Sequence, residues 1–259
     1  MSGNDGMKQM AEAMQFQING VMQRVRESME QSVGMSNMMS SMLENFLLQN
    51  LQIRSFIHAK PLCLELIIKN LGTIVVPVLS FTITLQSLNV SNASYKTVFQ
   101  SLPADLNVQE EITQEIQLLV PELGQYNGQI CLHCISPGTG NRLEIVHEFG
   151  VYYLQQLDIE NTTRITQKVD CIAENLSTAK LRELFHLSPL QGLAITPNGG
   201  YVLFGLNKIP WFLATVQIVD GDQNACNVTL EVLTPCPIDV YTLREEFIQL
   251  ATYKPRKLL

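Results

Sequence analysis

The sequence predicts an α+β protein in which an N-terminal amphipathic helix is followed by an immunoglobulin-like antiparallel β-sandwich and a small α+β platform domain. Two observations support this fold class. All ten methionines lie between Met1 and Met42, whereas all eleven prolines lie between Pro61 and Pro255. The spacing of apolar residues also changes, from three or four in the first part to two in the second. The expected parts are a helical, coiled-coil segment at residues 1–52, a sandwich at 53–159 and a platform at 160–259.

The N-terminal segment carries an apolar stripe at helical spacing. Its apolar residues recur at steps of three and four, and polar residues fill most of the other positions. Such a helix cannot bury its stripe alone, so we expect it to pair with a partner helix in a homodimer or heterodimer. Gly34 is a candidate break, and the alternative is a disordered leader without a role. The expected interface consists of Met14, Ile18, Val21, Met22, Val25 and Met29.

The middle of the chain has the pattern of an antiparallel sandwich. Short runs of alternating polarity are separated by turn signals, including the hairpin-like stretch at residues 137–141. Seven short strands of this kind are typical of immunoglobulin-like sandwiches, although the Cys, Trp, Cys spacing of true immunoglobulin domains is missing. The expected strands are residues 53–58, 63–70, 78–85, 94–99, 111–119, 128–135 and 142–153.

The C-terminal part reads as helix, strands and helix, which predicts a small antiparallel sheet covered by helices. A helix is expected over 175–187, with Ser177 or Asn175 as its N-cap. A closing helix is expected to run from Ile238 or Thr242 to Thr252. Residues 158–161 are the expected boundary with the sandwich. Extended segments are expected at residues 163–172, 193–196, 201–207, 212–219 and 225–233.

Composition excludes several classes of protein. The chain is 46% hydrophobic and 16% charged, so it has enough apolar surface to fold, and its net charge of −7 argues against a nucleic-acid-binding surface. The most apolar runs, at residues 62–68 and 73–81, are too short to cross a membrane. The N-terminus lacks the apolar core of a signal peptide. We therefore expect an intracellular protein, cytoplasmic or nuclear, with its six cysteines reduced.

No residue pattern predicts catalysis. Cys131 and Cys134 form a C-x-x-C motif, but residues three apart on a strand face opposite sides of a sheet, which favours a core strand over a metal or redox centre. None of the four histidines has a metal-ligand spacing. The acidic residues Asp220, Asp222, Glu245 and Glu246 are expected on the solvated surface. We expect no enzyme activity, no cofactor and no metal.

Two further features have both a structural and a functional interpretation. Trp211 is the only tryptophan, and its place at a strand start favours core packing, with a peptide-docking surface as the alternative. The C-terminal residues 253–259 are basic. They are either an interaction tail, including a weak nuclear-import patch, or a short run without function.

The order of the parts resembles the appendage of clathrin adaptor large chains. It also resembles the coiled coil, sandwich and platform tail of β-propeller scaffold proteins, such as BBSome and Fanconi core complex subunits. The resemblance covers about residues 55–252 and is carried by residues 181–185 (LRELF), 225–233 (ACNVTLEVL) and 241–250 (YTLREEFIQL). It is a similarity of architecture without an invariant motif. This chain lacks the propeller, and its helix favours the scaffold proteins over the adaptor chains.

This resemblance implies a non-catalytic scaffold or adaptor subunit of a multiprotein complex. The helix would join a partner subunit, and the sandwich and platform would dock on neighbouring subunits. The alternatives are a vesicle-coat or trafficking appendage that binds short peptides near Trp211, and a Fanconi-type DNA-repair core complex subunit.

Overall fold

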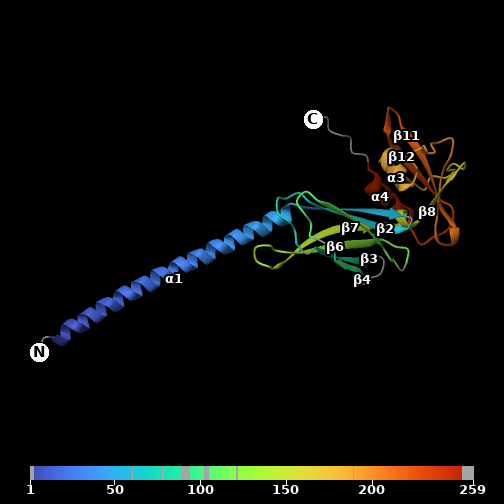
Figure 1. Ribbon diagram of the computed structural model, residues 1–259. Coiled ribbons are helices and arrows are strands. Elements are labelled where there is room, and N and C mark those ends of the chain that lie inside the picture. Colours follow the sequence, from blue (N-terminus) through green and yellow to red (C-terminus); the bar gives the residue numbers. More distant parts are fainter. Residues whose placement is uncertain are drawn as a thin grey trace.

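The computed structural model has a long helix that projects from a body of β-sheets and short helices (Figure 1). It describes residues 3–59, 61–77, 79–88, 94–101, 105–120, 122–188 and 190–252. The fold is of the mixed α+β class that the sequence predicts. The basic residues 253–259 lie outside the described ranges. No helix in the described ranges is long and apolar enough to cross a membrane.

Helix α1 (Gly3–Gln49) is continuous over 47 residues, about 70 Å at 1.5 Å per residue. The candidate break at Gly34 is wrong, because the helix passes through Gly20 and Gly34 without interruption. A single glycine costs a helix only about 1 kcal/mol, which is too little to end one of this length. A Cβ atom added at either glycine would meet nothing within 4 Å, so both positions face solvent.

The sandwich contains the seven antiparallel strands that the sequence predicts, in two sheets. Their order is β1-β2-β5 in one sheet and β4-β3-β6-β7 in the other. Alternate residues point into the core, among them the fully buried Leu66, Ile68, Phe81 and Ile83. The strands are β1 (Leu51–Ala59), β2 (Leu62–Asn70), β3 (Ser80–Ser87), β4 (Ser94–Ser101), β5 (Glu111–Gln117), β6 (Tyr126–Ile135) and β7 (Arg142–Val151).

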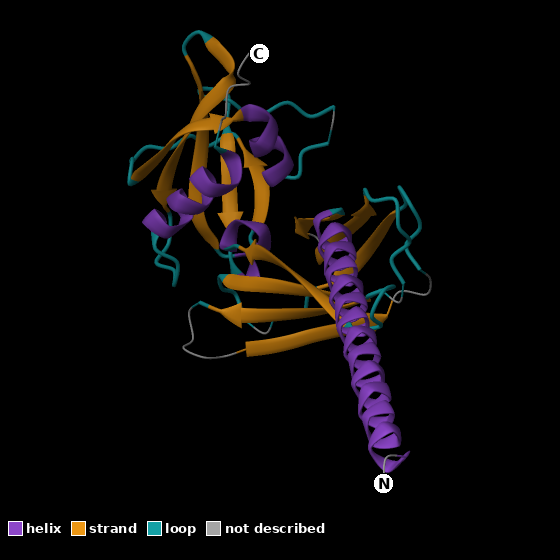
Figure 2. Ribbon diagram, turned by 90° about the vertical axis from the view of Figure 1, so that its left-hand side faces the viewer, coloured by secondary structure: helices purple, strands orange, loops and turns teal. Residues whose placement is uncertain are grey.

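The platform is a five-stranded antiparallel sheet in the order β8-β10-β11-β12-β9. Its helices lie together over one face of this sheet (Figure 2). Tyr201, Phe212 and Phe247 are fully buried between these two layers. The elements are α2 (Tyr153–Gln156), β8 (Asp158–Thr162), β9 (Cys171–Ser177), α3 (Thr178–Leu184), β10 (Gly200–Phe204), the 3-10 turn Leu206–Lys208, β11 (Pro210–Val219), β12 (Asp222–Val232) and α4 (Val240–Ala251).

The platform departs from the sequence prediction at its beginning. The helix expected from residue 175 begins at Thr178, because strand β9 pairs with β12 as far as Ser177. Ser177 is the N-cap, as expected, and its Oγ accepts a hydrogen bond from the backbone N–H of Lys180. Residues 158–161, the expected boundary, belong to β8, which pairs with β10 in the platform sheet.

A buried carboxylate joins the sandwich to the platform. Glu246 on α4 is only 1% exposed. Its Oε1 accepts hydrogen bonds from Gln125 Nε2 (2.6 Å) and the backbone N–H of Tyr153 (3.0 Å), and its Oε2 accepts one from the backbone N–H of Leu154 (2.9 Å). Burial raises the pKa of Glu246, and the three hydrogen bonds oppose that rise.

The surface position expected for Glu246 is therefore wrong, because three donors from outside α4 converge on its carboxylate and replace water. The side chain of Glu245, the next residue on the helix, is 66% exposed, as expected. Asp220 is also exposed, in the turn between β11 and β12.

Candidate partner-binding helix

The predicted interface residues of α1 are all exposed to solvent. Their exposed fractions lie between 49% for Val25 and 67% for Met22. An isolated amphipathic helix gains little stability from its own hydrogen bonds, and an apolar stripe of this length is a marker of a protein-binding surface. The six residues are Met14 (55%), Ile18 (57%), Val21 (54%), Met22 (67%), Val25 (49%) and Met29 (66%).

The same exposed stripe continues towards the body. Met35, Met39, Met42 and Phe46 are 42% to 65% exposed. They follow the same alternating steps of three and four as Met14, Ile18, Val21 and Val25, so this row covers about five heptads. Met22 and Met29, the other two predicted interface residues, lie beside the row. Two serines, Ser28 and Ser32, occupy its middle.

The charged side chains of Arg26 and Glu30 on α1 lie away from this stripe. Arg26 and Glu30 form an exposed ion pair of 2.9 Å between successive turns. Exposed pairs of this type stabilise a helix by a few tenths of a kcal/mol, which is small beside the apolar surface left open. The helix thus has a polar face and an uncovered apolar face.

Among the described residues, contacts with the body are made by the last turns of α1. Leu47 is 3% exposed in the sandwich core, and Thr139 Oγ1 donates a hydrogen bond of 2.5 Å to Glu44 Oε1. Hydrogen bonds from Thr139 and Ser136 lower the pKa of the Glu44 carboxyl. The body therefore fixes the direction of α1 while its apolar stripe stays uncovered.

Trp211 packs in the platform core. Its side chain is 6% exposed, and a Cβ atom added at Gly205 would lie 2.2 Å from its ring. The glycine thus provides the space that the indole fills. Core packing, the interpretation that the sequence favours, is what the structure shows, and the indole is too buried to form a docking surface for a peptide.

Cys131 and Cys134 have the burial expected of thiols in a strand. Cys134 faces the sandwich core at 2% exposure, and Cys131 is half-buried on the opposite face of β6. Burial raises the pKa of Cys134 to about 11, so its thiol stays protonated and unreactive at neutral pH. In the described ranges, no group of three or more His, Cys, Asp or Glu residues could hold a metal ion.

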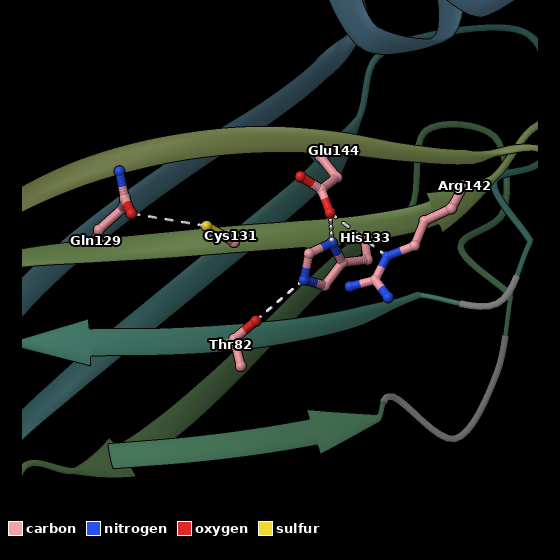
Figure 3. Close-up of polar contacts among 6 residues, drawn as sticks. All are labelled: Thr82, Gln129, Cys131, His133, Arg142 and Glu144. Carbon is pink, nitrogen blue, oxygen red and sulfur yellow. Dashed lines mark hydrogen bonds and ion pairs between the residues drawn. The ribbon is translucent and has the colours of Figure 1, made fainter. Parts of the chain in front are cut away.

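A polar cluster on the outer face of the four-stranded sheet was not expected from the sequence (Figure 3). His133 on β6 lies between Thr82 on β3 and Glu144 on β7. Its Nε2 is 3.0 Å from Thr82 Oγ1, and its Nδ1 is 3.2 Å from Glu144 Oε1. Arg142 Nε is 3.5 Å from the same carboxylate oxygen. The pairing of the strands, rather than any sequence spacing, brings these residues together.

The order hydroxyl, imidazole, carboxylate is that of a hydrolase triad, but the geometry does not support catalysis. Glu144 lies near Nδ1 without forming a hydrogen bond to it, so the imidazole is not oriented as a base. Three cavities of the described body are lined by residues other than Thr82, His133 and Glu144. We therefore interpret the cluster as a cross-strand polar network.

We predict that His133 makes the stability of the protein sensitive to acid. Burial and the nearby Arg142 lower the pKa of His133, against the opposing effect of Glu144. A histidine with a lowered folded-state pKa contributes stability that is present above its unfolded pKa of about 6.5 and is lost as the pH falls below it. We expect the His133→Gln variant to lose less stability than the wild type between pH 7.5 and pH 5.5 in urea unfolding.

His147 gives the comparison for that experiment, because burial lowers its pKa in the same direction. The His147→Gln variant should remove a separate part of the acid sensitivity, and the double variant should remove both parts. If the free energy of unfolding of His133→Gln depended on pH as that of the wild type does, His133 would not be a source of the acid sensitivity.

A groove of about 1030 Å³ lies between strand β1 and the platform helices. Strand β1 is an edge strand of its sheet, and Phe56 on it is 49% exposed. Tyr152, Leu184 and Leu250 also line the groove. Trp211 is not among the residues that line this groove.

No protein-family model and no curated protein matches the chain. Among solved structures, a β-glucosidase from Listeria innocua in complex with glucose aligns with 39% of this chain at 17% identity and a TM-score of 0.26. The chain spans 16% of the length of that protein. The ASH/PapD-like domain of human CEP192 (PapD-like domain 7) aligns over 39% of this chain and 82% of its own, at 12% identity and a TM-score of 0.26. These similarities carry no argument about function.

Proposed function

We propose that this protein is a non-catalytic assembly subunit that associates through α1 with a helix of another subunit. One observation carries the proposal, namely the stripe of large apolar side chains on α1 that is exposed and that no described part of the body covers. Exposed apolar side chains at heptad spacing pack knobs-into-holes against a second helix. Methionine is flexible and suits such a surface.

The body supports the same role. Leu47 and the hydrogen bond between Thr139 and Glu44 fix the base of α1 on the sandwich, and Glu246 fixes the sandwich on the platform. A partner bound along α1 would therefore be held at a defined position relative to both parts of the body. Fixed relative positions are what an assembly subunit has to provide. The sandwich and platform offer surfaces for further subunits, including the groove beside Phe56.

The test compares two double variants of full-length tagged protein in extracts of the cells that make it. Ile18→Glu with Val25→Glu places charges in the stripe. Asn19→Glu with Gln23→Glu adds the same charge on the polar face of the same turns. We expect wild type and control to sediment well above the 29.1 kDa of the single chain, and the stripe variant to sediment at a lower mass because it has lost the subunit bound to α1.

Sedimentation of the wild type as a single chain would overturn the proposal. So would a stripe variant that keeps the mass of the wild-type complex. Circular dichroism of the purified variants verifies that the body remains folded in each.

A further inference from the structure

We propose that the partner of α1 is a second copy of the same helix, bound antiparallel and centred on Glu30. This inference rests on the proposed function and names the partner. It follows from the exposed stripe, in which the pattern of polar and apolar positions is symmetric about the middle.

The symmetry appears when each stripe position is paired with the position equally far beyond Glu30. Two serines then meet at the centre, and every other layer is apolar on both sides. Apolar side chains thus meet apolar ones, and hydroxyls meet hydroxyls that can exchange a hydrogen bond. The layers are Ser28 with Ser32, Val25 with Met35, Val21 with Met39, Ile18 with Met42 and Met14 with Phe46, each occurring twice in the pair.

Neighbouring antiparallel registers lose this match. A shift of one heptad in one direction places Ser32 against Val21 and Ser28 against Val25. The opposite shift places Ser32 against Met35. Each mismatch puts a hydroxyl against an apolar side chain and leaves it without a partner. The centred register avoids every such layer.

The antiparallel arrangement also matches side-chain character. The N-terminal half of the stripe has the stiff, β-branched Ile18, Val21 and Val25, and the C-terminal half has flexible methionines. Antiparallel pairing puts one stiff and one adaptable side chain in each of these layers. A parallel pair would instead stack identical residues, with narrow valine layers at one end and wide methionine and phenylalanine layers at the other.

Charges and bulk favour the same arrangement. Arg26, Glu27 and Glu30 lie outside the stripe, so the pair brings no like charges into its core. Antiparallel helix dipoles attract each other. Met14 and Phe46 of one helix are about 48 Å apart along its axis, so the two bodies lie at opposite ends and do not compete for space.

The experiment uses full-length chains with single cysteines in the stripe. Val25→Cys and Met35→Cys chains carrying different tags are produced separately and together, and purified protein is oxidised gently. Position 25 faces position 35 of the other copy in the antiparallel pair. Random pairing of the two variants makes roughly half of the pairs mixed, and we expect these mixed pairs to form a disulfide-linked dimer. Each variant alone should form no such dimer.

Gln23→Cys with Asn37→Cys is the matched control, because both positions face outward at the same level of the helix pair. The wild type measures the background from the half-buried Cys63, Cys131 and Cys236. Dimers of Val25→Cys alone would show a parallel pair and overturn the inference. So would a purified wild type that sediments at 29.1 kDa. In either case, the sedimentation test in cell extracts decides separately whether α1 binds another subunit.

Discussion

Replacing Glu246 by leucine is expected to destabilise the protein by about 3 kcal/mol. The substitution removes the acceptor for the backbone N–H groups of Tyr153 and Leu154 and for the amide of Gln125. Buried donors without an acceptor lose their hydrogen bonds to water on folding and regain none. Urea unfolding followed by far-UV circular dichroism measures the loss.

The neighbouring residue gives the matched control. Glu245→Leu changes an exposed side chain on the same helix, paired with the neighbouring Arg244, and should change the free energy of unfolding by less than about 0.5 kcal/mol. Glu246→Gln keeps one acceptor oxygen but turns an NH₂ group towards one of the donors, so its loss should be intermediate. Equal stability of Glu246→Leu and Glu245→Leu would contradict the role of this carboxylate in joining the two parts of the body.

The Asn70→Asp variant is expected to lose about 4 kcal/mol, although the two side chains have nearly the same shape. Asn70 is 2% exposed. Its Nδ2 donates to the carbonyl oxygens of Ile74 (2.8 Å), Leu106 (3.3 Å) and Asn107 (3.1 Å), and its Oδ1 accepts from the backbone N–H of Gly72 (2.9 Å). An aspartate at this position would put a carboxylate against three carbonyl oxygens.

Asn227→Asp is the control for that measurement. Asn227 uses its Oδ1 to accept from the backbone N–H of Asn175, and an aspartate can accept the same bond. We expect a change of less than about 0.5 kcal/mol. Asn70→Ala should fall between the two, because it removes the bonds without burying a charge. Equal urea midpoints of Asn70→Asp and Asn227→Asp would contradict the stabilising role of the hydrogen bonds that Asn70 makes to residues 72–74 and 106–107.

The sandwich could be predicted from the sequence because its signal is local. In β2 the alternation of Leu64, Leu66 and Ile68 with half-buried residues is visible in the chain itself, and the buried apolar residues of this strand are those three. The apolar stripe of α1 is local in the same way. Its spacing gives the helix face, and the exposure of each of its residues agrees with an uncovered surface.

The first strands of the platform were harder to predict. Strand β8 is short, at the edge of its sheet, and contains Glu160 and Asn161, so it shows no alternation of buried and exposed residues. Strand β9 contains Asn175, whose φ of 62° lies in the left-handed region, next to an irregularity in the pairing with β12. An asparagine and a serine before an apolar run indicated a helix start, although the strand continues to Ser177.

Contacts between distant parts of the chain have no signal in a single sequence. Glu246 and Gln125 are 121 residues apart, and Glu246 is buried only because the sandwich and α2 bring donors to it. His133 meets Thr82 through the register of β6 with β3. Glu246 and His133 carry no distinctive sequence pattern, because strand order and domain packing determine what surrounds them.

The length of α1 separates the two surfaces proposed to bind partners. Residues 14–25 of the stripe lie tens of ångströms from the groove beside Phe56, as the rise of 1.5 Å per residue requires. A partner on α1 and a partner on the body can therefore occupy one chain at the same time without touching each other. Where both surfaces belong to one larger partner, the first contact raises the effective concentration for the second. Two modest affinities would then combine into one tight attachment.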